Sequence, residues 1–159
     1  MPHPVVYQGD LEALLKKWKD EGTLKLANGQ CARLPQVLTS VGHTSGWTRG
    51  PRVLDMRDLK PGTVIANFKL IDGKWKFPNQ EGWHAGLFYK FEGRRVMTNS
   101  LPCEFSMVDQ WVDKRPGLRG MAVLSEVFKK QNPRYDKPSN RADEFYLSLI
   151  HISEPTRPY

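Results

Sequence analysis

Two residues of the chain combine a reactive side chain with a position suited to covalent chemistry, and the first is Cys31. It follows the turn Asn28-Gly29-Gln30, where a helix is expected to begin. Backbone N–H groups and the helix dipole at such a position stabilise a thiolate, the nucleophilic form of cysteine. The alternative is that Cys31 is an inert thiol that fills core space.

The second reactive residue is His84, which favours the nucleophilic interpretation of Cys31. His84 precedes the apolar segment AGLFYKF, where an imidazole has no packing role. At the start of a strand it is held rigidly and can face a helix packed across the sheet. An imidazole so placed is a general base for a thiol. The histidines His3 and His43 are expected to be surface or hydrogen-bonded residues, with His43 kept as a lesser candidate because it lies in the loop after the Cys31 helix.

Asp109 is the leading candidate for a third residue that orients His84 and fixes its tautomer. Strand alternation in SMVDQW places Asp109 on one face with Met107 and Trp111, and Gln110 on the other face. A carboxylate among apolar neighbours needs a partner, because an unpaired buried charge is costly. Gln110 replaces Asp109 if the alternation is shifted, and an ion pair with an arginine is the alternative role of Asp109.

The elements that must position these residues follow from periodicity. Apolar residues at helical spacing predict a helix over 10–20, with Asp10 as its N-cap and Gly22 at its end. A second helix should run from near Cys31 to about Ser40, because Pro35 is tolerated only in a first turn. Loops are expected over 42–61, with room for one short helix, over 69–83 and over 125–141. Strands are expected near 63–68, 84–91, 95–98, 105–111, 118–124 and 143–147. Helices followed by consecutive strands predict one α+β domain, with the helices packed on an antiparallel sheet.

The last segment of the chain has a different character. LSLIHISEPTR, residues 147–157, resembles the conceptual translation of an adaptor used in sequencing libraries. We therefore expect a single domain over 1–146 and an adaptor-derived tail over 147–159, with no functional residue in the tail.

Composition excludes several classes of protein. The 159 residues suit one domain, and two cysteines are too few for a disulfide scaffold or a four-cysteine zinc site. The net charge of +7 favours anionic partners, but no nucleic-acid-binding motif accompanies it. No apolar run is long enough for a membrane span, and the N-terminus lacks the features of a secretory signal. We expect no metal and no cofactor, because Cys31, His84 and Asp109 lack a fourth ligand.

The fragments GQCARL, HTSGW, KPGTVIANF, FPNQEGWHAGLFYKF and MVDQW, in this order, resemble a small bacterial family of papain-like proteins. That family belongs to the NlpC/CHAP superfamily of cell-wall amidases and is related to type VI secretion amidase effectors. The resemblance spans about residues 29–145. It implies a papain-like fold and a cysteine amidase that cuts peptidoglycan stem peptides, acting as an antibacterial effector or a lytic enzyme.

Within this resemblance, Cys31 is the nucleophile, His84 the base and Asp109 the orienting residue. Residues expected to bind substrate are Gln30, Trp47, Trp83 and Gln110, and Trp111 is a further candidate for the groove. We expect a monomer that acts on peptidoglycan, has a cognate immunity protein, and is made in the cytoplasm and delivered to the periplasm or cell wall by a non-classical route. The alternatives are a papain-like protease or acyltransferase with another substrate, and an inactive wall-binding domain.

Overall fold

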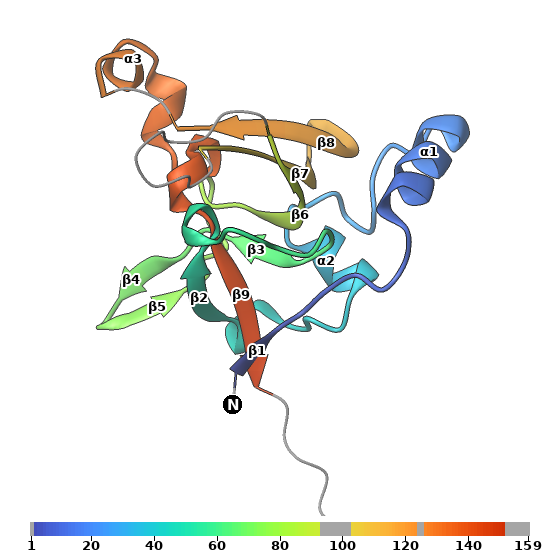
Figure 1. Ribbon diagram of the computed structural model, residues 1–159, viewed down its shortest axis with the longest axis horizontal. Helices are drawn as coiled ribbons and strands as arrows, with labels where there is room; N and C mark the ends of the chain where they lie inside the picture. The colour runs from blue at the N-terminus through green and yellow to red at the C-terminus, as the bar shows by residue number, and fades with distance from the viewer. Residues whose placement is uncertain (1, 93–102, 124–125, 152–159) are drawn as a thin grey trace, which may run out of the picture.

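The computed structural model describes residues 2–92, 103–123 and 126–151 (Figure 1). Its centre is an antiparallel sheet in the order β1-β9-β3-β6-β7-β8, in which β2 also pairs with β9. The strands of this sheet are β1 (Pro2–Pro4), β2 (Thr48–Arg52), β3 (Val64–Ala66), β6 (Ala85–Phe91), β7 (Glu104–Trp111), β8 (Lys114–Ala122) and β9 (Tyr146–His151). A separate hairpin consists of β4 (Lys69–Ile71) and β5 (Lys74–Lys76).

The helices are short, as expected for an α+β domain. They are α1 (Leu11–Glu21), α2 (Arg33–Leu38) and α3 (Glu126–Gln131), with 3-10 turns η1 (Thr44–Gly46), η2 (Val53–Asp55), η3 (Pro133–Asp136), η4 (Pro138–Asn140) and η5 (Ala142–Glu144). The predicted fold class is therefore confirmed: helices and turns flank an antiparallel sheet. Within the described ranges, no helix is long and apolar enough to cross a membrane.

Helix α1 begins and ends where its sequence predicts. The side chain of Asp10 accepts a hydrogen bond from the backbone N–H of Ala13 at 3.2 Å, which satisfies a donor of the first turn. Gly22 ends the helix in the left-handed conformation, with φ of +63°. Leu11 and Trp18 are buried, so the apolar face of α1 is anchored to the rest of the domain.

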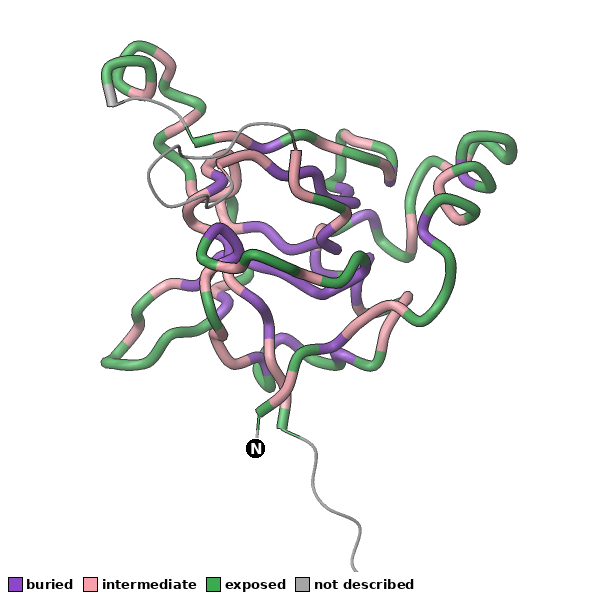
Figure 2. Tube along the Cα trace, viewed as in Figure 1, coloured by how far each residue is buried: buried purple, intermediate pink, exposed green. Residues whose placement is uncertain are grey.

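The sheet has a core on each of its two faces, because alternate residues of a strand point in opposite directions. Val64 and Ala66 of β3 lie in the core that also contains Leu34 of α2. Ile65, between them, lies in the core of the opposite face with Phe105 and other aromatic side chains. Buried positions accordingly concentrate in the central strands (Figure 2). The strands that carry the functional site therefore belong to a rigid part of the molecule.

Several elements differ from the expectation. The segment 42–61 contains strand β2, and the segment 69–76 forms the hairpin β4–β5, although both were expected as loops. The segment expected as loop over 125–141 contains α3 and two 3-10 turns. Helix α2 begins at Arg33, two residues after Cys31, which lies in the preceding turn. The strand expected near 95–98 lies outside the described residues.

Strand β9 extends across the boundary expected at residue 146. It pairs with β1, β2 and β3, and Leu147 and Ser148 are buried. The alternation of LSLIH suits a strand whatever its origin. The adaptor origin of residues 147–157 therefore stays a prediction, but the first five of these residues form part of the sheet.

Candidate active site

The loop that precedes Cys31 is held in place by the buried side-chain amide of Gln110. Gln110 of β7 is fully buried, and its Oε1 accepts a hydrogen bond from the N–H of Leu26 at 2.8 Å. Its Nε2 donates to the carbonyl oxygens of Leu26 and Gln30, each at 3.0 Å. Gln110 thus pins both ends of the loop that precedes the cysteine. It faces away from His84, and its bonds reach this loop rather than the imidazole.

His84 is held through its backbone by Asn67, which immediately follows β3. The N–H of His84 donates to Oδ1 of Asn67 at 2.9 Å, and the N–H of Asn67 donates to the carbonyl of His84 at 2.9 Å. The Nδ2 of Asn67 donates to the carbonyls of Glu144 and Pro138, at 2.7 and 3.3 Å. Asn67 is fully buried and was missed by the sequence reasoning. The sequence feature that could have identified Asn67 is its position as a polar residue within the apolar segment TVIANF.

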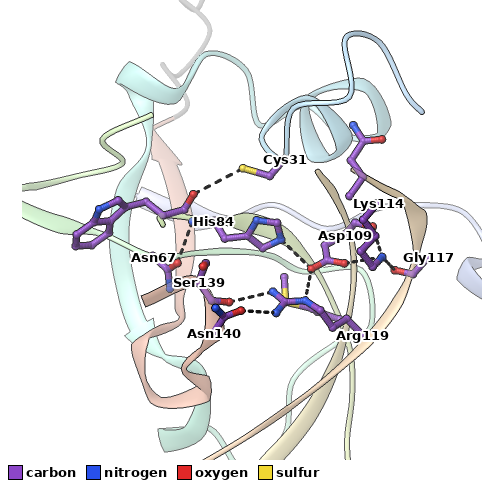
Figure 3. A network of polar contacts seen from close by, with 12 residues as sticks. Cys31, Asn67, His84, Asp109, Lys114, Gly117, Arg119, Ser139 and Asn140 are labelled. Carbon is purple, nitrogen blue, oxygen red and sulfur yellow. Dashed lines mark hydrogen bonds and ion pairs between the residues drawn. The ribbon is translucent and has the colours of Figure 1, made fainter. Parts of the chain in front are cut away.

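The structure brings Cys31, His84 and Asp109 together (Figure 3). His84 Nε2 lies 2.7 Å from Oδ2 of Asp109, and both side chains are almost completely buried. With Nε2 engaged by the carboxylate, Nδ1 is the nitrogen left for Cys31, and His84 lowers the pKa of the Cys31 thiol. Trp111 packs edge-on against the imidazole at 5.8 Å between ring centroids. Asp109 and Trp111 thus share a strand face, as alternation predicts.

Asp109 has two further partners, both on β8. Nε of Arg119 donates to the same Oδ2 at 2.7 Å, and Nζ of Lys114 forms an ion pair with Oδ1 at 3.0 Å. Lys114 also donates to the backbone carbonyl of Asp109 at 3.1 Å. The carboxylate therefore orients a histidine and pairs with an arginine at once, although the sequence presented these as alternatives.

The protonation of the three residues is strongly coupled. Burial disfavours the thiolate of Cys31, but His84 and the N–H groups of Ala85 and Ala32 outweigh burial and lower the pKa of the thiol below its usual value. Burial also opposes charge on His84, yet Asp109 and Cys31 raise the pKa of the imidazole. The arrangement favours a thiolate beside an imidazolium.

The pKa of the Asp109 carboxyl is lowered, whereas the pKa of the His84 imidazole is raised. Burial alone would raise the pKa of Asp109. His84, Arg119 and Lys114 reverse that effect and hold the pKa of Asp109 well below its usual range. Asp109 is therefore ionised near neutral pH.

Cys31 and His84 open into a cleft of about 710 Å³. Its lining includes Gln30, Trp83 and Trp111, together with the charged residues Glu81, Asp113, Arg119 and Lys137. Sγ of Cys31 lies 3.9 Å from the carbonyl of Trp83. Of the predicted substrate-binding residues, Gln30 and Trp83 thus face the cleft.

Trp47 lies behind the cleft wall. It is buried, its Nε1 donates to the carbonyl of Gly42 at 3.1 Å, and its ring packs on Phe77 at 5.1 Å. Phe77 is a cleft-lining residue. Trp47 therefore supports the wall through Phe77, just as Gln110 supports the cysteine loop.

The described residues contain no group of three or more His, Cys, Asp or Glu side chains arranged to hold a metal ion. Over the same ranges, no disulfide links Cys31 and Cys103. The thiol of Cys31 is thus available for chemistry.

Comparison with known proteins places this site in a family context. No family model matches the chain. Over 133 residues it is 28% identical to a type VI secretion amidase effector 2 protein of Salmonella typhi, a match that covers 80% of this chain and 90% of that protein. A solved structure of a type 6 secretion amidase effector 2 (Tae2) superposes with a TM-score of 0.62 and 27% identity, over 82% of this chain and 88% of that one. The chain is therefore a relative of the type VI secretion amidase effectors and shares their papain-like α+β fold.

Proposed function

We propose that this protein is a cysteine amidase that hydrolyses amide bonds in peptidoglycan stem peptides, with Cys31 as nucleophile, His84 as acid and base, and Asp109 as the residue that orients His84. The observation that carries the proposal is that Cys31 and His84 line an open cleft, with His84 hydrogen-bonded to Asp109 behind it (Figure 3). The similarity to amidase effectors supports the reaction class.

The first half of the reaction forms an acyl-enzyme. The thiolate of Cys31 attacks the amide carbonyl carbon, and the carbonyl π electrons move to oxygen. The backbone N–H of Cys31 is the proposed donor to this oxyanion. His84, protonated at Nδ1, gives its proton to the amide nitrogen. The C–N bond then breaks as the carbonyl re-forms, the amine leaves, and the acyl group remains on Cys31 as a thioester.

The second half returns the enzyme to its starting state. Neutral His84 takes a proton from water, whose oxygen attacks the thioester carbonyl. The C–S bond breaks, the thiolate is regenerated beside the imidazolium, and the product leaves as a carboxylic acid. Throughout, Asp109 accepts the hydrogen bond of Nε2 and keeps Nδ1 directed at the sulfur.

We assign substrate contacts to Gln30, Trp83 and Trp111, since all three line the cleft beside Cys31. The indole rings of Trp83 and Trp111 offer flat apolar walls for an extended peptide. Trp47 and Gln110 are assigned supporting roles, because their contacts are with Phe77 and with the loop before Cys31. The net charge of +7 suits retention on an anionic wall.

As an effector, the protein would reach the wall of a competing cell through a secretion apparatus, and a cognate immunity protein would protect the producer. Both features are proposals that rest on the relationship to type VI effectors.

Mass spectrometry of purified peptidoglycan digested with wild type and Cys31→Ala tests the proposal. We expect amide-cleaved fragments only with the wild type, while circular dichroism shows that the variant is folded. Fragments released by Cys31→Ala within tenfold of the wild-type rate would exclude the covalent mechanism. No cleavage by either protein would favour another substrate or a wall-binding role.

A further inference from the structure

The carboxylate of Asp109 is surrounded by more positive charge than a catalytic triad needs. Oδ2 lies 2.7 Å from both His84 Nε2 and Arg119 Nε, and Oδ1 lies 3.0 Å from Lys114 Nζ. Arg119 and Lys114 each bring a cationic side chain to the carboxylate, whereas His84 gains and loses its proton during the proposed reaction. One negative charge is thus shared between two fixed cations and one titrating group.

Both cations are held in place by contacts independent of the carboxylate. Nη2 of Arg119 donates to the carbonyl of Ser139 at 3.0 Å, and Nη1 donates to Oδ1 of Asn140 at 3.3 Å. Lys114 donates to the carbonyls of Arg115 and Gly117, at 3.1 and 3.4 Å. Because these contacts restrain both side chains, their charges stay near Asp109 whether or not His84 is protonated.

The ring of Trp111 packs against this charge cluster. The Trp111 centroid lies 5.3 Å from Cζ of Arg119 and 5.6 Å from Nζ of Lys114, and the ring also contacts His84. The side chains of Arg119 and Lys114 are only 17% and 21% exposed. Charges in such surroundings interact more strongly than charges in water, so the two cations act on His84 as well as on Asp109.

The consequence for catalysis follows from the sign of the charges. Asp109 alone favours the imidazolium, and an imidazolium that is too stable is a poor acid for the leaving amine. We propose that Lys114 and Arg119 are positioning residues that offset the charge of Asp109, so that His84 keeps its orientation yet releases its proton readily. This inference refines the role of His84 in the proposed amidase reaction, and the geometry of the ion cluster carries it.

Other charged groups near His84 are less able to have this effect. Cys31 faces the imidazole directly and favours its charged form. Glu81, Lys137 and Asp113 line the same cleft, but Glu81 and Lys137 pair with each other at 2.7 Å with side chains 88% and 49% exposed. Asp113 is also exposed. Solvent screens these three charges far more than it screens Lys114 and Arg119.

The test is a pH titration of the His84 imidazole by NMR, in the full chain without substrate. Lys114→Met removes the charge and keeps the length of the side chain, and we expect the pKa of His84 to rise by about one pH unit. Arg119→Gln should also raise the pKa of His84. Lys114→Arg retains the charge and should restore the wild-type titration, whereas a purely structural role would not distinguish Lys114→Arg from Lys114→Met.

Lys74→Gln is the matched control, because Lys74 is exposed on the hairpin β4–β5 and the variant has the same net charge as Lys114→Met. We expect its His84 titration to match that of the wild type. An unchanged His84 pKa in folded Lys114→Met and Arg119→Gln would overturn the inference, as would equal shifts in Lys114→Met and Lys114→Arg. Since the titration uses no substrate, its outcome is independent of whether peptidoglycan is cleaved.

Discussion

Gln110 and Leu26 are joined by two hydrogen bonds, in which the side-chain amide of one residue pairs with the backbone N–H and carbonyl of the other. The bonds measure 2.8 and 3.0 Å and link β7 to the loop before Cys31. The neighbouring residue of β7, Asp109, binds His84. Adjacent residues of one strand therefore hold the two reactive groups from opposite faces of the sheet.

Gln110→Ala should reduce stability more than it reduces the chemical rate. The substitution leaves polar groups of Leu26 and Gln30 unpaired, at a cost of roughly 1–3 kcal/mol in the free energy of unfolding. Gln110 does not touch His84, so we expect the rate of the folded protein to change by less than about tenfold. Urea denaturation and peptidoglycan hydrolysis measure the two effects. Gln8→Ala, which removes an exposed amide, should leave stability within about 0.5 kcal/mol.

Asp109→Asn should have the opposite profile, with its main effect on rate. An asparagine can donate to Nε2 of His84 as well as accept from it, so the tautomer that directs Nδ1 at Cys31 is no longer enforced. Arg119 and Lys114 would also remain beside His84 without their counter-charge. We expect kcat/KM to fall by roughly 10²–10⁴. A benign Asp109→Asn together with an inactive Gln110→Ala would move the orienting role to Gln110.

The elements that the sequence predicts well are those whose signal is local. Helix α1 has its apolar period, its Asp10 cap and its Gly22 stop within one short segment. Alternation in β7 likewise predicts that Asp109 and Trp111 share a face. Strands β2, β4 and β5 lack such a pattern, because TRGPR contains glycine and proline and KWK is mostly charged. Strand β2 pairs with β9, which is distant in the chain, whereas β4 and β5 pair with each other across the turn Asp72-Gly73.

Asn67 and the supporting role of Gln110 escaped prediction for the same reason, although Gln110 was expected to bind substrate or to replace Asp109. Asn67 binds residues 17, 71 and 77 positions away, and Gln110 binds residues 80 and 84 positions away. A buried amide gives no local sign of which backbone groups it will satisfy. Cys31, His84 and Asp109 could be proposed from the sequence because each reactive residue type also occupies a distinctive place, after a turn or at a defined strand position.

The stability that Asp109 contributes should depend on pH in a bell-shaped manner. Its pKa is lowered on folding, so its contribution is present above the unfolded value of about 3.9 and is lost as pH falls through the folded value. The pKa of His84 is raised, so its contribution is present below about 6.5 and is lost as pH rises through the folded value. Urea titrations at several pH values should show the greatest advantage of wild type over Asp109→Asn between about pH 4 and 6.5. A difference that does not vary with pH would contradict this linkage.

Two truncations separate the part of the C-terminal segment that supports the sheet from the part that does not. Truncation after His151 leaves β9 intact, and we expect wild-type stability and activity. Truncation after Tyr146 removes all but the first residue of β9, which leaves backbone groups of β1, β2 and β3 unpaired and removes the buried Leu147. We expect this variant to be largely unfolded or insoluble, as measured by circular dichroism and expression yield. Equal stability of the two truncations would show that β9 is dispensable.

Ser148→Val tests whether the sequence of β9 is well matched to its surroundings. Ser148 is fully buried, and its hydroxyl has no hydrogen-bond partner among the described residues. An unpaired buried hydroxyl costs roughly 1–3 kcal/mol, and valine is of similar size and prefers strands. We therefore expect Ser148→Val to raise the free energy of unfolding by about 1 kcal/mol in urea denaturation, with activity unchanged because Ser148 lies outside the cleft lining. Ser106→Val is the comparison, since Ser106 is buried in β7 but its hydroxyl donates to the carbonyl of Lys90 at 3.4 Å. Ser106→Val should therefore show no gain in the free energy of unfolding. A loss of stability in Ser148→Val would show that the Ser148 hydroxyl has a hydrogen-bond partner.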